Sequence, residues 1–179
     1  MKKWVKYSLL FLFALFLLRG RLFRLLVSYH PIGERPTFGL TNKDLMQSIE
    51  NHPVDTSIQS IIQRALDLTA VHLRFTSGKN DIDPNLLFSS KNAHCVGYAA
   101  FFNTTCLALL RKEKLENRFQ VTHFRGKLTL LGFDLHQLTS SPFFGDHDFN
   151  VVEDLETGKK VYVDASLRDV LGIGLVSGD

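Results

Sequence analysis

Apolar side chains recur at helical spacing through much of the first two thirds of the chain. Residues 7–18 carry no charge and predict an apolar helix. After the prolines and glycine of 31–36, Thr41 and Asp44 form a capping pattern that predicts a short helix to about Asn51. A longer helix is predicted after Asp55, Thr56 and Ser57, because apolar or small side chains follow three and four positions apart, at Ile58, Ile61, Ile62, Ala65, Leu66, Thr69 and Leu73.

A third helix is predicted from about Asn92 to Leu115, after a polar loop at 76–92. Its spacing of four and three residues puts one stripe of side chains on a single face: Cys95, Ala99, Phe102, Cys106, Leu109 and Leu110. Cys95 therefore lies in the first turn, on the face that meets the rest of the fold. Gly97 and Ala99 keep its surroundings small.

The last third of the chain changes to an alternating pattern that is typical of strands. Strands are predicted at 118–125, with an extension over 127–133, and at 147–153 and 159–164. The last two flank a turn at 156–158 and form a hairpin, and 134–146 is expected to be a loop. The predicted fold class is α+β, with a helical N-terminal half packed on an antiparallel sheet of about three to five strands and a hydrophobic N-terminal helix before them.

The N-terminal segment allows three interpretations. Its basic start fits a cleaved signal peptide, but no small-residue cleavage site follows Leu18. It also fits an amphipathic helix on a membrane surface or in a partner. The preferred interpretation is a single-pass membrane anchor, with Lys6 and Arg19 reaching toward the lipid headgroups. Residues 1–30 are then the anchor, 31–40 a linker and 41–179 the folded domain, and the balanced flanking charges leave the orientation open.

The charge distribution excludes one class of partner. The chain has 45% hydrophobic and 22% charged residues, as globular proteins do, and a net charge of +3. Residues 1–24 hold six of the 21 basic side chains and no acid, which leaves 15 basic and 18 acidic side chains, a charge of −3, for the rest. A mildly acidic body without a basic cluster is not expected to bind nucleic acid.

Three residues suggest nucleophilic chemistry. At the start of a helix the thiol of Cys95 meets the positive end of the helix dipole, which favours the nucleophilic thiolate. On the predicted hairpin Asp164 falls within about three positions of His147, on a strand about 4.8 Å away. A carboxylate there can hold one imidazole nitrogen and leave the other for the thiol. The order is a Cys on a helix, then His and Asp on strands.

Other assignments remain open for the neighbouring residues. Asp146 and Asp148 flank His147 and could replace Asp164 as its partner. His123 could face the same site or be a packed strand residue. His94 with Cys95, and 146–148, could supply metal ligands, but no paired Cys-x-x-Cys or His-Glu-x-x-His spacing supports zinc, so neither metal nor cofactor is expected. Cys106 is expected in the core.

The residues around this set resemble the transglutaminase-like (papain-like) superfamily. The similarity rests on Cys95 within 92–99, with the aromatic-Ala pair Tyr98 and Ala99 after it, on His147 within 147–149, and on Asp164 within 161–166. It extends over about residues 58–170. The resemblance implies a Cys at the start of a helix, set against a sheet that carries His and Asp.

The resemblance also implies a function. Cys95 would be the nucleophile, His147 the base and Asp164 the residue that orients the base, in acyl transfer or amide hydrolysis on a protein or peptide substrate. Hydrolysis and cross-linking are equally compatible with the sequence. The alternative is an inactive, membrane-tethered binding module with the same fold.

Overall fold

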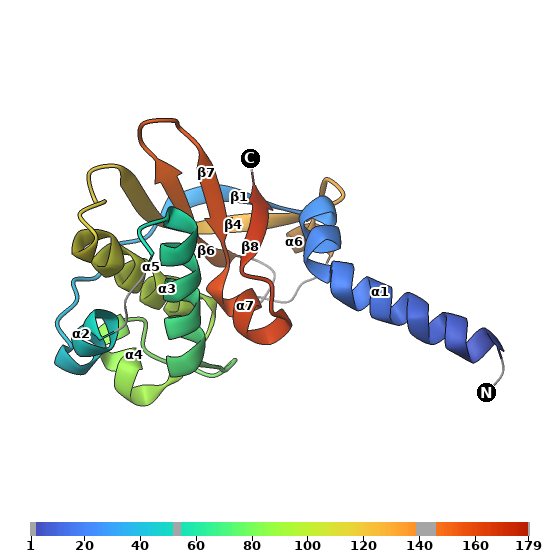
Figure 1. Cartoon of the computed structure of the whole chain (residues 1–179), viewed down its shortest axis with the longest axis horizontal. Helices are drawn as coiled ribbons and strands as arrows, with labels where there is room; N and C mark the ends of the chain where they lie inside the picture. The colour runs from blue at the N-terminus through green and yellow to red at the C-terminus, as the bar shows by residue number, and fades with distance from the viewer. Residues whose placement is uncertain (1–2, 52–54, 139–145, 179) are drawn as a thin grey trace.

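The fold joins a layer of helices to a strongly curved sheet (Figure 1). The computed structural model describes residues 3–51, 55–138 and 146–178. The α+β class predicted from the sequence is confirmed. The helices are α1 (Lys3–Leu26), α2 (Lys43–Glu50), α3 (Ile58–His72), α4 (Pro84–Ser90), α5 (Cys95–Lys112), α6 (Leu135–Leu138) and α7 (Ala165–Leu171).

Within these ranges six strands form the main sheet, in the order β1-β8-β7-β6-β4-β5. They are β1 (Val27–Glu34), β4 (Phe119–Leu130), β5 (Phe133–Asp134), β6 (His147–Asp154), β7 (Lys160–Val163) and β8 (Leu175–Gly178). A separate pair joins β2 (Arg74–Phe75) to β3 (Asn92–Ala93). Because β1 pairs with β8 on one side and with β4 on the other, five of the strands form a closed circuit.

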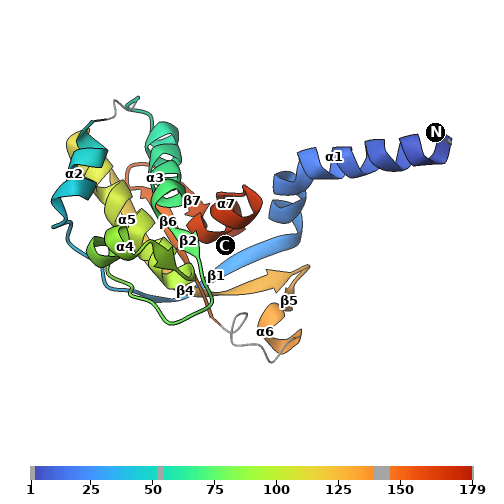
Figure 2. The same cartoon turned by 90° about the horizontal axis from the view of Figure 1, so that it is seen from below.

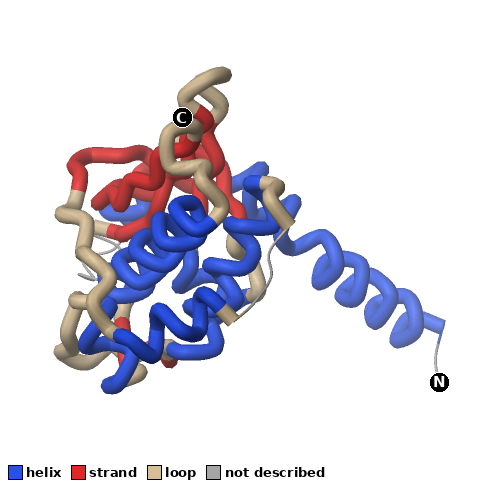
Figure 3. The backbone as a smooth tube through the Cα atoms, turned by 60° about the vertical axis from the view of Figure 1, so that its left-hand side comes forward, coloured by secondary structure: helices blue, strands red, loops and turns tan. Residues whose placement is uncertain are grey.

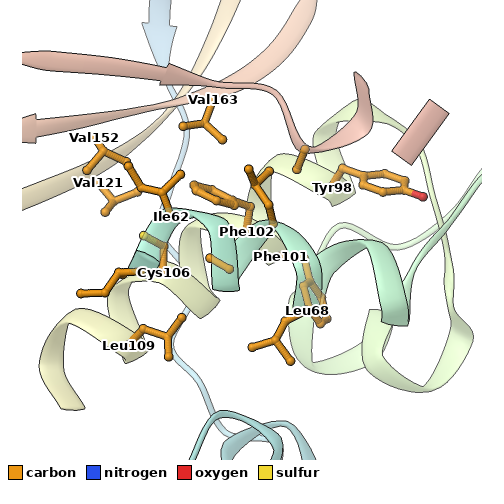
Figure 4. Close-up of a cluster of buried hydrophobic side chains, with 14 of the residues drawn as sticks. Ile62, Leu68, Tyr98, Phe101, Phe102, Cys106, Leu109, Val121, Val152 and Val163 are labelled. Atoms are coloured by element: carbon orange, nitrogen blue, oxygen red, sulfur yellow. The ribbon is translucent and has the colours of Figure 1, made fainter. Parts of the chain in front are cut away.

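Each face of the curved sheet has its own core. The helices lie over one side of the strands (Figure 3). On this outer face α3 and α5 pack against Val121, Val152 and Val163 (Figure 4). The inner face holds a second apolar cluster, composed of Val27, Tyr29, Phe149, Val151, Tyr162, Ile173 and Val176. Adjacent residues of β6 thus point to different cores, as the two-residue period of a strand requires.

Side-chain caps explain where several helices begin. The side chain of Ser57 caps α3, close to the predicted start. The cap of α2 is Asn42, whose side chain accepts from the backbone N–H groups of Asp44 and Leu45, and not the predicted Thr41. The sequence interpretation missed α4 inside the predicted loop, although Asp83 as cap and Pro84 in the first turn are a typical helix start.

The predicted anchor and linker boundaries need correction. Strand β1 runs from Val27 to Glu34, across the boundary at residue 30, and its residues pair with 124–130 of β4. The folded body thus begins near Val27 and not at 41. The alternation of buried Val27 and Tyr29 with half-buried neighbours is the strand signal, and it was obscured by the apolar run before it.

The prediction of a single-pass membrane anchor is not supported. Among the described residues, no helix is both long and apolar enough to cross a membrane. The uncharged part of α1 covers only residues 7–18, whereas a spanning helix needs about 20 apolar residues. Helix α1 projects from the body (Figure 2), and its last turns contact the body where Arg19 Nε donates to the carbonyl oxygen of Leu171 (3.0 Å).

The sheet also differs from the prediction in its extent. Its six strands exceed the expected three to five, because β1 and β8 add to it and pair with each other in parallel. The predicted strands at 118–125 and 127–133 form mostly one continuous strand, β4. Of the loop predicted at 134–146, residues 135–138 form α6, and 139–145 lie outside the described residues.

The close approach at Gly126, where β4 pairs with both β1 and β6, yields a stability prediction. A Cβ on Gly126 would lie 2.3 Å from a ring carbon of Phe149 and 2.6 Å from the carbonyl oxygen of His30. We expect Gly126→Ala to lower the free energy of unfolding by about 1–3 kcal/mol, measured by urea denaturation. Gly39→Ala is the control, because a Cβ there meets nothing within 4 Å. Equal stability of the two variants would contradict this packing.

Candidate active site

Helix α5 brings Cys95 to the end of the sheet where β6 begins. It is the central helix, buried along most of its length, and Cys95 is its first residue. Asn150 Nδ2 of β6 donates to the carbonyl oxygen of Ala99 (2.9 Å), and Asn103 Nδ2 donates to that of Val121 on β4 (3.1 Å). These two buried bonds tie the helix to the strands, so the position of the thiol is fixed by the sheet.

Small residues let the helix start come close to its neighbours. A Cβ on Gly97 would lie 2.9 Å from the Cβ of Ala93 and 3.1 Å from a methyl group of Leu87. The cap is His94, whose Nδ1 accepts from the backbone N–H of Val96 (3.3 Å). Cys95 itself is only half-buried and has a free thiol, so it is the accessible one of the two cysteines.

His147 is the first residue of β6 and lies beside the thiol. Its Nε2 lies 2.6 Å from Asp164 Oδ2, and its imidazole is within hydrogen-bonding and electrostatic range of Cys95. Since Nε2 is taken by the carboxylate, Nδ1 is the nitrogen left for the sulfur. The structure therefore brings Cys95, His147 and Asp164 together in the predicted order.

Asp164 directly follows β7 and caps α7. Its Oδ2 accepts from the hydroxyl of Tyr29 (2.8 Å) besides facing His147, and its Oδ1 accepts from Ser166 Oγ (2.7 Å) and the backbone N–H of Leu167 (2.9 Å). The side chain is 1% exposed. Four partners thus compensate the lost hydration of this carboxylate.

The hairpin register agrees with the predicted separation of at most about three positions between His147 and Asp164. Asn150 pairs with Val163, so Asp164 follows opposite Phe149, two positions from His147. The turn closes where the backbone N–H of Gly158 donates to the carbonyl oxygen of Asp154 (2.7 Å), with Gly158 at a φ of +70°. This separation brings the carboxylate and the imidazole into contact.

The pairing changes the protonation of both partners. Burial alone would lower the pKa of His147, but the charge and hydrogen bond of Asp164, with smaller contributions from Cys95, raise that pKa to about 10. Burial likewise tends to raise the pKa of Asp164, and the interactions with His147, Leu167 and Ser166 outweigh it and lower the pKa. Both shifts favour the charged pair, in which an imidazolium faces a carboxylate.

Tyr29 is a site residue that the sequence interpretation missed. Its buried ring lies edge-on to His147, with centroids 5.9 Å apart, and edge-on to Phe149 at 5.1 Å. Tyr29 belongs to β1, which is 135 positions from Asp164 in the chain, so local sequence context could not link the two. Burial, followed by the charge of Asp164, raises the pKa of its hydroxyl, which stays a hydrogen-bond donor.

The residues that the sequence offered as alternative members of the site have other contacts. Asp148 does not hold His147; it binds His123 Nε2 (2.8 Å) and Arg35 instead. Asp146 faces Arg125, at 3.6 Å. Cys106 lies in the core as predicted, where burial raises its pKa to about 12.

Neither a scan against protein-family models nor a search of curated proteins found a match to the chain. Within the described ranges 3–51, 55–138 and 146–178, no three His, Cys, Asp or Glu side chains are grouped to hold a metal ion.

The raised pKa of His147 predicts how stability depends on pH. The folded state holds the proton up to about pH 10, whereas the ordinary pKa is 6.5. The stabilisation is therefore complete below the ordinary value and is lost as pH rises through about 10. We expect the difference in free energy of unfolding between the parent chain and His147→Gln to shrink across this range, measured by urea denaturation.

Both chains in this comparison should carry Cys95→Ser, so that titration of the thiol does not contribute. A difference that stays constant from the ordinary histidine pKa of 6.5 to about pH 10 would contradict the ion pair with Asp164.

Proposed function

We propose that the protein is a thiol-dependent acyltransferase or amide hydrolase, in which Cys95 is the nucleophile, His147 the acid and base, and Asp164 the residue that positions His147. The observation that carries the proposal is the contact chain from the half-buried thiol, through the imidazole, to a buried carboxylate with four partners. A structural ion pair alone does not require a free thiol at its outer end.

The reaction follows from the positions of the protons. With His147 charged by its partner Asp164, the thiolate of Cys95 attacks the carbonyl carbon of an amide and forms a C–S bond. The imidazolium then gives its proton to the leaving nitrogen as the C–N bond breaks. The resulting thioester reacts with water, which gives hydrolysis, or with an amine, which gives cross-linking, and neutral His147 takes the proton of the incoming nucleophile.

The start of α5 offers a site for the oxyanion of the tetrahedral intermediate. The first backbone N–H groups of a helix have no partner within the helix, and that of Val96 is already held by His94. The N–H of Cys95 is then the proposed donor to the oxyanion. The same chemistry, with the order Cys, His and Asp, is the basis for proposing membership of the transglutaminase-like superfamily.

Alkylation of the two cysteines tests the proposal. We expect iodoacetamide to label Cys95 readily at pH 7, below the value of about 8.5 where a free thiol titrates. Cys106 should stay unlabelled until the chain unfolds, because it is fully buried. His147→Ala should slow labelling of Cys95 by on the order of tenfold or more, because the imidazolium that stabilises the thiolate is lost. Rates are followed by mass spectrometry of the intact chain.

Asp164→Asn should slow labelling less than His147→Ala, because Asp164 acts through the imidazole. Slow labelling of Cys95 that His147→Ala leaves unchanged would instead favour the inactive binding module.

A further inference from the structure

A second charged cluster lies next to the triad and takes no part in it. Asp148 follows His147 on β6 and therefore points to the other face of the sheet, toward α5. Its Oδ2 lies 2.8 Å from His123 Nε2 and accepts a hydrogen bond from Arg35 Nε (2.9 Å). Its Oδ1 accepts a hydrogen bond from Arg35 Nη2 (3.2 Å). The carboxylate is 1% exposed, so these bonds replace its hydration.

Arg35 is held in place by both its backbone and its side chain. Its backbone N–H donates to the carbonyl oxygen of His123 (2.8 Å), just after β1 ends. Its guanidinium meets Asp148 with two parallel bonds, the geometry that best fixes a guanidinium plane. Burial opposes the charge on Asp148, but the bonds from His123 and Arg35 prevail and lower its pKa, so the pair remains ionised.

Half of the Arg35 guanidinium remains available. A guanidinium has five N–H groups, and Asp148 uses two of them. Among residues 3–51, 55–138 and 146–178, no other acceptor takes the remaining three, and the side chain is 36% exposed. The pKa of Arg35 is raised, mainly by its bonds to Asp148, and charge on Cys95 contributes, which places the guanidinium in electrostatic range of the sulfur.

The nearby carboxylates do not accept hydrogen bonds from the three remaining N–H groups of Arg35, which are therefore open to a ligand. The charge of Asp148 is buried and already shared between His123 and Arg35. Asp146 is half-exposed and faces Arg125. The positive end of α5 and the imidazolium of His147 act on the same space beside Cys95. An anionic group is the ligand that these charges favour.

We propose that Arg35 binds a carboxylate of the substrate next to the carbonyl that Cys95 attacks. The inference rests on the proposed function and narrows its substrate class to amides with a carboxylate close to the scissile bond, as in an acidic or C-terminal peptide residue. The guanidinium of Arg35 suits such a group, because its planar arrangement of N–H donors can bind a carboxylate through two parallel hydrogen bonds.

Two alkylating reagents of the same shape test this assignment. Iodoacetate carries a carboxylate and iodoacetamide a neutral amide, and with either one the thiolate displaces iodide and forms a thioether. We expect Arg35→Gln to lower the ratio of the iodoacetate rate to the iodoacetamide rate at Cys95 by on the order of tenfold. The rate with iodoacetamide should change less than twofold, because the triad is intact.

Two further variants test whether a change in this rate ratio comes from the guanidinium of Arg35. Arg118→Gln removes one exposed charge at the other end of β4, paired with Asp154, and should leave the ratio unchanged. Arg35→Lys keeps the positive charge but loses the paired N–H donors of the guanidinium, and should give an intermediate rate ratio. If Arg35→Gln does not fold, as judged by circular dichroism, the fall in ratio expected for Arg35→Lys decides the question.

The outcomes separate this proposal from the one it rests on. A ratio that neither Arg35 variant changes, or an equal loss with both reagents, would overturn the role of Arg35 and leave the thiol chemistry in place. Failure of iodoacetamide to label Cys95 in the unaltered chain would overturn the proposed function, and the role of Arg35 with it.

Discussion

The buried carboxylate of Asp164 is the constraint on which the site depends. A carboxylate at 1% exposure is tolerated only with good partners, and Asp164 finds them on β1, on β6 and in the first turn of α7. These bonds link two strands of the closed sheet, because Tyr29 lies on β1 and His147 on β6. It also fixes the imidazole, whose remaining nitrogen is left for Cys95. One carboxylate thus both links strands of the closed sheet and holds the imidazole beside Cys95.

The two faces of the sheet give the site its two halves. Side chains on β6 alternate, so His147 joins Asp164 and Tyr29 whereas Asp148 joins His123 and Arg35. Cys95 at the start of α5 lies within electrostatic range of both His147 and Arg35. One half supplies the proton chemistry that we propose, and the other supplies a fixed cation beside it. The hydrogen bond from Asn150 of β6 to Ala99 of α5 holds this helix in place relative to both halves of the site.

Local patterns predicted the elements that carry the three site residues, because their signals lie within a few positions. The stripe on α5 placed Cys95 in its first turn, and the predicted turn at 156–158 placed Asp164 within about three positions of His147, where the structure has two. Contacts between distant segments could not be found this way. Tyr29 and Arg35 reach the site only because β1 pairs with β4 and β8. The short alternation at 27–30 follows directly on an apolar helix, whose pattern predicts an anchor. The cap that starts α4 is a local signal, but it lies within a stretch whose many polar residues are typical of a loop.

The proposed chemistry requires that Asp164 keeps His147 charged beside the thiol. Nitrogen-15 NMR of the imidazole, with His147 assigned by comparison with His147→Gln, measures that charge directly as pH is changed. The account predicts an imidazolium at pH 7 that loses its proton only near pH 10, and a lower titration midpoint in Asp164→Asn. A neutral imidazole at pH 7, or a midpoint near the ordinary value of 6.5 in both chains, would contradict it.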